Sequence, residues 1–194
     1  MTRLRLRKTI SNNYSQVFLF PAVIKRSGFI KLESISNKIN VSDMNEMLGN
    51  QYFMARNYPA AEIELEKSLE KFPAHKGIRR KLIVCYTQTG KVRNALQAFL
   101  SLAKEDIDFI INADPIEDDC PCPELVEKMN SLEPQLDSLD REIVAGILWL
   151  YCDIEKSLQH FDNAVKFNND DPTVHAAVKL ISSKLKSISS NQVL

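Results

Sequence analysis

One pattern of apolar and small residues occurs twice in this chain, and the two copies are separated by 34 residues. A period of about 34 residues is typical of helix–turn–helix units that stack side by side, because each unit can bury its apolar face only against its neighbours. The period therefore predicts an all-helical stack, whose surface is better suited to binding than to catalysis. The repeated residues are Leu48, Tyr52, Ala61 and Leu65, which recur as Leu82, Tyr86, Ala95 and Phe99.

The composition agrees with a helical, globular chain. Hydrophobic residues make up 44% and charged residues 26% of the 194 residues, and only 5 are glycine, which is ordinary for a soluble domain. No apolar run approaches the roughly 20 residues that a membrane-spanning helix needs, so we expect no transmembrane segment. Four irregularly spaced cysteines do not form the framework of a disulfide-rich secreted domain. We therefore expect a reducing, cytoplasmic setting.

The first 41 residues differ in charge from the rest of the chain. They contain eight Lys or Arg and one acid, a net charge of +7, so residues 42–194 carry −7. Three interpretations stay open: a signal peptide with residues 17–24 as its apolar segment, an Arg-rich organelle transit peptide, or a disordered tail. The third includes sequence translated ahead of a functional start at Met44 or Met47. It agrees best with the long basic region, so we treat residues 1–41 as an extension.

From Ser42 onwards the apolar residues follow a helical period. Pro59 suits the first turn of a helix, and Gly90 can take the left-handed conformation that ends one. Residues 104–137 break the period with four prolines and eleven acids, so we interpret them as an insertion with a helical turn at 106–112 and a short helix at 124–132. The expected repeats are 42–75, 76–103 and 138–171, followed by a capping helix at 173–188 and a tail at 189–194.

These residues resemble the tetratricopeptide repeat, a 34-residue pair of antiparallel helices. The first repeat matches the family pattern at Leu48, Gly49, Tyr52, Ala61, Leu65, Ser68 and Pro73. The second repeat has Ile83 in place of the glycine, and the third lies 62 residues further on with Leu148, Ser157, Phe161 and Ala164. The resemblance implies a right-handed α-solenoid over residues 42–188. The acidic insertion looks like a feature of a small group of bacterial repeat proteins, and we attach no activity to it.

Tetratricopeptide repeats commonly bind a peptide or a partner helix in a concave groove lined by the first helices of successive repeats. Phe53, Met54 and Trp149 could supply apolar anchors, although a core position explains Trp149 equally well. The acids around Arg80 favour a ligand with basic residues. The resemblance places these residues in the groove: Asp43, Glu46, Asn50, Phe53, Met54, Arg80, Val84, Thr87, Gln88, Glu142, Trp149 and Leu150.

Chaperone-binding members of the family hold a C-terminal carboxylate with Lys, Asn and Arg side chains. Asn50 falls where one such Asn would lie, but Glu46 takes the place of a required Lys. A carboxylate at that position repels a carboxylate ligand. We therefore do not expect this chain to bind a C-terminal carboxylate in that way.

Cys120-Pro121-Cys122 supports an alternative function, a thiol-dependent metal or redox module. Zinc needs four ligands, whereas this chain has no second cysteine pair and its three histidines are scattered, so a rigid turn explains the motif better. Cys85 and Cys152 fall on expected first helices and are predicted to be buried. We expect no cofactor and no bound metal.

The leading hypothesis is a non-catalytic adaptor that binds a protein or peptide. No phosphate-binding loop or hydrolase motif occurs in the sequence. Nucleic-acid binding is not expected, because the basic N-terminal residues lack the interleaved aromatics of such sites beyond Tyr14, Phe18 and Phe20. A third possibility is an accessory subunit that acts by self-association.

Overall fold

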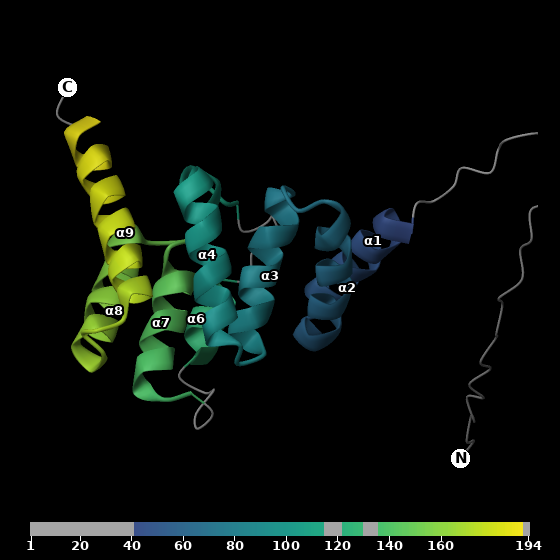
Figure 1. Ribbon diagram of the computed structural model, residues 1–194, viewed down its shortest axis with the longest axis horizontal. Helices are drawn as coiled ribbons and strands as arrows, with labels where there is room; N and C mark the ends of the chain where they lie inside the picture. The colour runs from purple at the N-terminus through teal and green to yellow at the C-terminus, as the bar shows by residue number, and fades with distance from the viewer. Residues whose placement is uncertain (1–40, 115–121, 130–135, 192–194) are drawn as a thin grey trace, which may run out of the picture. The chain divides into compact units, whose positions relative to one another are not determined.

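The described part of the chain, residues 41–114, 122–129 and 136–191 of a computed structural model, is helical and contains no β-strand (Figure 1). All of these residues belong to one unit, Lys38–Leu194. The helices are α1 (Val41–Met54), α2 (Tyr58–Lys71), α3 (Lys76–Gln88), α4 (Val92–Asp106), α5 (Asp108–Ile111), α6 (Cys122–Met129), α7 (Ser138–Trp149), α8 (Ile154–Phe167) and α9 (Pro172–Asn191). The all-α prediction is confirmed for these residues.

The longer helices form three pairs, and each pair packs on the next. The partners are α1 with α2, α3 with α4, and α7 with α8, each joined by a short turn. The second helix of one pair packs on the first helix of the next pair, α2 on α3 and α4 on α7. The last helix, α9, packs on α8 and also contacts α4 (Figure 1). Nearest-neighbour packing of this kind is how stacked repeats build a continuous core.

The side chains that begin the helices explain where the turns lie. Asp137 accepts a hydrogen bond from the backbone N–H of Asp140 at 2.7 Å, and Asp153 accepts from two N–H groups at 3.0 Å. Such caps satisfy backbone donors that have no partner within the helix. Between α3 and α4, Gly90 has φ +74°, which confirms its predicted role. The equivalent residue between α1 and α2, 34 positions earlier, is Arg56, with φ +60°.

The buried residues of the second helices keep the spacing seen in the sequence. The nine residues at the three equivalent positions of α2, α4 and α8 have no exposed surface. The rings of Phe99 and Phe161 stack with their centroids 5.7 Å apart, and this contact joins the second helix pair to the third. The nine residues are Ala61, Ala95 and Ser157, then Leu65, Phe99 and Phe161, then Ser68, Leu102 and Ala164.

Glycines allow close approach in the first and third pairs. A Cβ atom added to Gly49 would lie 2.8 Å from the Leu65 side chain, and one added to Gly146 would lie 2.7 Å from the Phe161 ring. In the third pair, Ser157 Oγ also donates a hydrogen bond to the Gly146 carbonyl at 2.6 Å. Leu65 and Phe161 are 96 residues apart, whereas Gly49 and Gly146 are 97 apart. If the first and third pairs had the same register, these two separations would be equal. The glycine of α7 therefore lies one residue later, relative to α8, than the sequence repeat predicts.

The insertion leaves the order of packing intact. Helix α4 continues to Asp106, so its last turn lies inside the expected insertion 104–137, and α5 occupies part of the expected turn 106–112. Helix α7 then packs on α4 as the next repeat would. At the C-terminus, α9 runs to Asn191, which corrects the boundary between the expected capping helix 173–188 and the tail.

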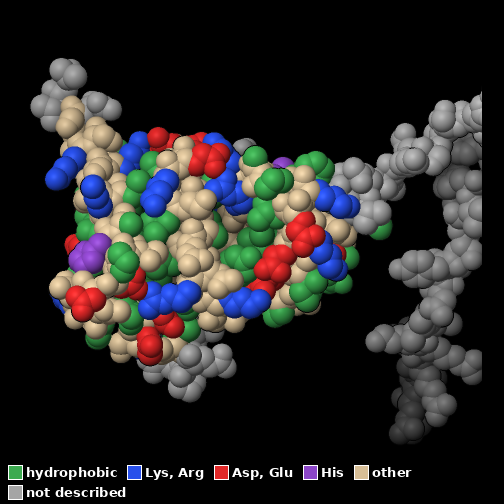
Figure 2. Space-filling model, in the orientation of Figure 1, with side chains coloured by type: hydrophobic (Ala, Val, Ile, Leu, Met, Phe, Trp, Pro, Cys, Tyr) green, Lys and Arg blue, Asp and Glu red, His purple; other side chains and the backbone are tan. Residues whose placement is uncertain are grey.

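Exposed apolar side chains are concentrated on the first pair. Met44, Met47 and Met54 of α1 and Ile63 of α2 are each more than half exposed, and hydrophobic side chains are visible over these helices among mixed charges in Figure 2. Among the helices that the structure describes, none combines the length and the apolar composition that a membrane crossing requires.

Candidate functional site

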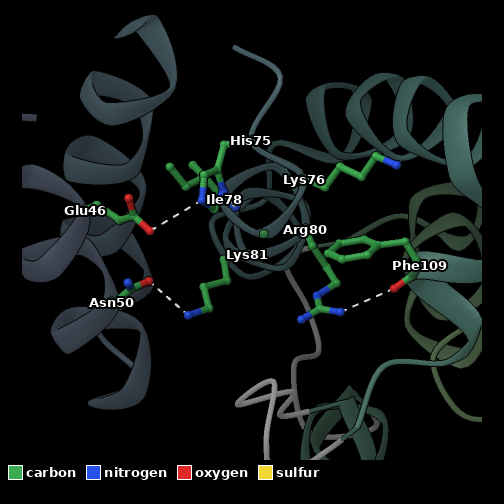
Figure 3. Close-up of a pocket in the computed structure, with 9 residues that line it drawn as sticks. Glu46, Asn50, His75, Lys76, Ile78, Arg80, Lys81 and Phe109 are labelled. Atoms are coloured by element: carbon green, nitrogen blue, oxygen red, sulfur yellow. Dashed lines mark hydrogen bonds and ion pairs between the residues drawn. The ribbon is translucent and has the colours of Figure 1, made fainter. Parts of the chain in front are cut away.

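A cavity of about 320 Å³ lies between α1, α3 and α5 (Figure 3). Three residues predicted for the groove line it: Glu46 and Asn50 from α1 and Arg80 from α3. The structure therefore brings together the N-terminal part of the predicted groove. The other lining residues are His75, Lys76, Gly77, Ile78, Lys81 and Phe109.

Two polar contacts cross the cavity from α1 to α3. His75 Nε2 lies 3.8 Å from Glu46 Oε1, and Lys81 Nζ donates to Asn50 Oδ1 at 2.9 Å (Figure 3). His75 Nδ1 accepts the backbone N–H of Ile78 at 3.2 Å, so the ring also caps α3. The Lys81 ammonium lies 5.7 Å from the Phe53 ring centroid. The cavity thus presents both donors and acceptors, carried by side chains that the two helices hold in place.

On the other side of the cavity, Arg80 links α3 to the inserted helix α5. Its guanidinium carbon lies 4.6 Å from the Phe109 ring centroid, and Nη1 donates to the Phe109 carbonyl at 3.3 Å. Only 6% of Arg80 is exposed. The planar guanidinium can stack and donate at once, so this residue fixes the cavity wall.

Two charge pairs brace the rim where α3 meets the end of α4. Lys76 Nζ lies 2.8 Å from Asp106 Oδ2, and Arg79 pairs with Glu105. The hydrogen bond from Lys76 lowers the pKa of Asp106, and the hydrogen bond from Arg79 lowers the pKa of Glu105. The hydrogen bond with Asp106 raises the pKa of Lys76. Both acids therefore stay ionised beside the cavity.

Four residues predicted to line the groove belong instead to the core. Phe53 and Leu150 are 1% exposed, and Val84 and Thr87 are 2% exposed. Phe53 packs edge-on against Tyr58, with ring centroids 5.9 Å apart, and Thr87 Oγ1 donates to the Val84 carbonyl at 2.7 Å. They are corrected to core positions, because a buried side chain cannot contact a partner without rearrangement of the fold.

The register of α7 corrects the placement of two more predicted residues. Glu142 turns towards α8, where its carboxylate lies 2.8 Å from His160 Nδ1. Trp149 also meets α8, with Lys156 Nζ 4.0 Å from its ring centroid. A displacement of one residue rotates a helix by about 100°, so the positions equivalent to Glu46, Asn50 and Phe53 are Ile143, Ile147 and Leu150.

The last three predicted residues have separate positions. Met54 is 59% exposed at the end of α1. Gln88 is half-buried and donates to Thr87 Oγ1 at 3.1 Å. The side chain of Asp43 lies outside the described residues.

Glu46, Asn50 and Phe53 of α1, together with the residues at the equivalent positions of α3 and α7, form one side of the stack, which we call the first-helix face. It is open at the cavity and buried elsewhere. Its residues are Glu46, Asn50 and Phe53 of α1, Arg80, Val84 and Thr87 of α3, and Ile143, Ile147 and Leu150 of α7 and the turn after it.

Sequence reasoning missed His75, Lys81 and Phe109 as cavity residues. Lys81 directly follows Arg80 and could have been found by including the flank of α3 that faces α1. His75 could have been recognised as a helix cap from its position before Lys76. Phe109 lies in the insertion, where the 34-residue period gives no signal.

The cysteines divide between buried and exposed positions. Cys85 is buried as predicted, and burial raises the pKa of its thiol to about 12. Cys152 is exposed in the turn after α7, which corrects the prediction that it is buried, and it lines a second cavity of about 330 Å³ with Leu150 and Asp153.

The thiol alternative rests on two residues whose side chains lie outside the described part. Cys120 precedes the described helix α6, and Cys122 is its first residue. Among the side chains that are described, no group of three His, Cys, Asp or Glu residues could hold a metal ion. The metal or redox function of Cys120 and Cys122 stays a prediction.

No protein-family model, no curated protein and no solved structure matches this chain.

Proposed function

We propose that the chain is a tetratricopeptide-like right-handed solenoid that acts as a non-catalytic adaptor for a protein or peptide. The observation that carries the proposal is the open cavity on the first-helix face, where side chains from α1, α3 and α5 meet. The recurrent burial in α2, α4 and α8 supports the repeat assignment. A partner segment that enters between α1 and α3 would use the face through which stacked repeats commonly bind peptides.

The cavity lining favours an acidic residue on the partner. Arg80 and Lys81 line the cavity with Glu46, while Lys76 at the rim pairs with Asp106 and Glu105. This proposal differs from the sequence-based expectation of a basic ligand, which counted Glu142, an acid that turns towards α8. Lys81 is the side chain best placed to respond, because its ammonium already donates across the cavity to Asn50 and would form a charge-assisted bond to a carboxylate there.

Affinity capture from the native host with the full chain tests this function. The variant is Lys81→Glu, and the matched control is Lys67→Glu, because the Lys67 side chain is 51% exposed on α2, away from the cavity. A partner that binds the wild type and the control, and at least about tenfold less to Lys81→Glu, supports the proposal.

Partners retained equally by all three proteins would place binding elsewhere. Unchanged circular dichroism of Lys81→Glu is required, so that lost binding is not lost folding. Phe53→Ala is unsuited to this purpose because Phe53 is a core residue.

A further inference from the structure

Helix α6, in the middle of the acidic insertion, connects the third helix pair to the first. It packs against α7. Its Glu124 carboxylate lies 3.3 Å from Arg56 Nη2 and 3.4 Å from Arg56 Nε, at the end of α1. Helix α6 therefore reaches from α7 to the turn that follows α1, past the position of α3 in the stack.

The apolar side of α6 is part of the core. Leu125 is 3% exposed and belongs to the same buried cluster as Phe53, Val84, Ile143, Ile147 and Leu150, and Val126 packs against this cluster. Burial raises the pKa of Tyr58 to about 12, with the Arg56 charge opposing and the Glu124 charge adding to the rise. Helix α6 thus contributes Leu125 and Val126 to the same core that buries these residues of the first-helix face.

Arg56 holds α6 from a backbone conformation that favours glycine. It has φ +60°, and its equivalent in the second repeat, Gly90, has φ +74°. The same reverse turn closes both helices, with Asn57 N–H donating to the Tyr52 carbonyl and Lys91 N–H to the Tyr86 carbonyl, each at 2.9 Å. An arginine is strained in this region. The Arg56 side chain binds Glu124. A glycine, as at the equivalent position 90, would relieve the strain but could not make this contact.

We propose that α6 is a built-in ligand of the first-helix face, and that this face accepts, in exchange for α6, an amphipathic partner helix of the same chemistry. That chemistry is an acidic residue directly before a Leu-Val pair, as in Glu124-Leu125-Val126. The acid binds Arg56, and the apolar pair joins the core beside α7. This inference deepens the proposed adaptor function but uses a different part of the face from the Lys81 cavity, so the two can fail separately.

The test compares two variants of the full chain. Leu125→Asp places a charge on the buried side of α6, and Glu127→Ala, which changes an exposed residue of the same helix, is the matched control. Hydrogen exchange reports whether α6 opens while α3 and α7 stay protected. A labelled peptide with the sequence of residues 122–131, with Ser in place of Cys122, reports binding to the vacated face. We expect α6 to open in Leu125→Asp alone, and the peptide to bind this variant at least about tenfold more tightly than the wild type.

A charge reversal checks the chemistry of the partner. The peptide with Glu124→Lys should bind Leu125→Asp about two- to fivefold more weakly, and adding Arg56→Glu to the protein should restore binding. If α7 and α6 both lose protection from hydrogen exchange in Leu125→Asp, α6 is an integral core helix and the proposal is overturned. Failure of α6 to open, or equal peptide binding by wild type and Leu125→Asp, would overturn it as well. Retained capture of partners through Lys81 would leave the adaptor function standing in each of these cases.

Discussion

The two parts of the first-helix face have the same origin in the repeat but different surroundings. Between α1 and α3 the face is open: Lys81 donates a hydrogen bond to Asn50 across the cavity, and Glu46 pairs with His75. Towards α7 the face is buried, with Ile143 and Ile147 fully covered. The difference shows that repeat position alone does not decide whether a residue of this face is open to a partner.

The largest expected effect is the difference in stability between alanine substitutions of Phe53 and of its neighbour Met54. Phe53→Ala removes a side chain that is 1% exposed and should lower the free energy of unfolding by about 3–5 kcal/mol. Met54→Ala alters a side chain that is 59% exposed and should change it by about 0.5 kcal/mol or less. Urea denaturation of both variants measures the contrast. Equal, small effects would mean that the face is open at Phe53.

A smaller difference in stability is expected between alanine substitutions of two glycines, Gly146 in the buried region and Gly77 at the open cavity. Gly146→Ala would place Cβ 2.7 Å from the fully buried Phe161 ring and should cost about 1–3 kcal/mol of stability. Gly77 lines the cavity, and its added Cβ would meet only the His75 ring, at 3.2 Å, so Gly77→Ala should change stability by about 0.5 kcal/mol or less. Thermal unfolding of the pair compares them. A Gly146→Ala protein as stable as the wild type would contradict the close helix approach.

The smallest effect is a pH dependence at the rim of the open cavity. The hydrogen bond from Lys76 lowers the pKa of Asp106 below its ordinary value of 3.8. The pair therefore adds stability above pH 3.8, and this contribution is lost as the pH falls through the lower folded value. Denaturation midpoints between pH 7 and pH 2 should fall less steeply for Asp106→Asn and for Lys76→Met than for the wild type. An NMR titration that places the pKa of Asp106 at or above 3.8 would refute this explanation.

Periodicity predicted the helices well where packing follows the repeat. Leu65, Phe99 and Phe161 were identified from spacing alone, and all three are fully buried. Gly90 was identified from turn chemistry and has the positive φ that the prediction requires. Such residues are set by contacts within a helix pair, and those contacts recur in every repeat.

The candidate site was only partly predictable, because two contacts that define it lie outside the repeat. The one-residue displacement of α7 depends on the fit of Gly146 against Phe161, and it turned Glu142 and Trp149 towards α8. Leu125 and Val126 of α6 join the same core as Val84 and Leu150, although they lie in the insertion, where the repeat gives no pattern. Three-dimensional contacts between distant segments therefore decided which predicted groove residues stay open.

The contact between α4 and α7 also bears on how the chain folds. Its two helices are separated by the whole insertion, whereas the helices of each pair are joined by a few residues. The entropy lost on closing a loop grows with its length, and contacts distant in sequence slow folding. The first two pairs can form from nearby contacts. The joint between α4 and α7 is therefore expected to be the last to close, and a ribosome-bound chain would complete it only after α7 has emerged.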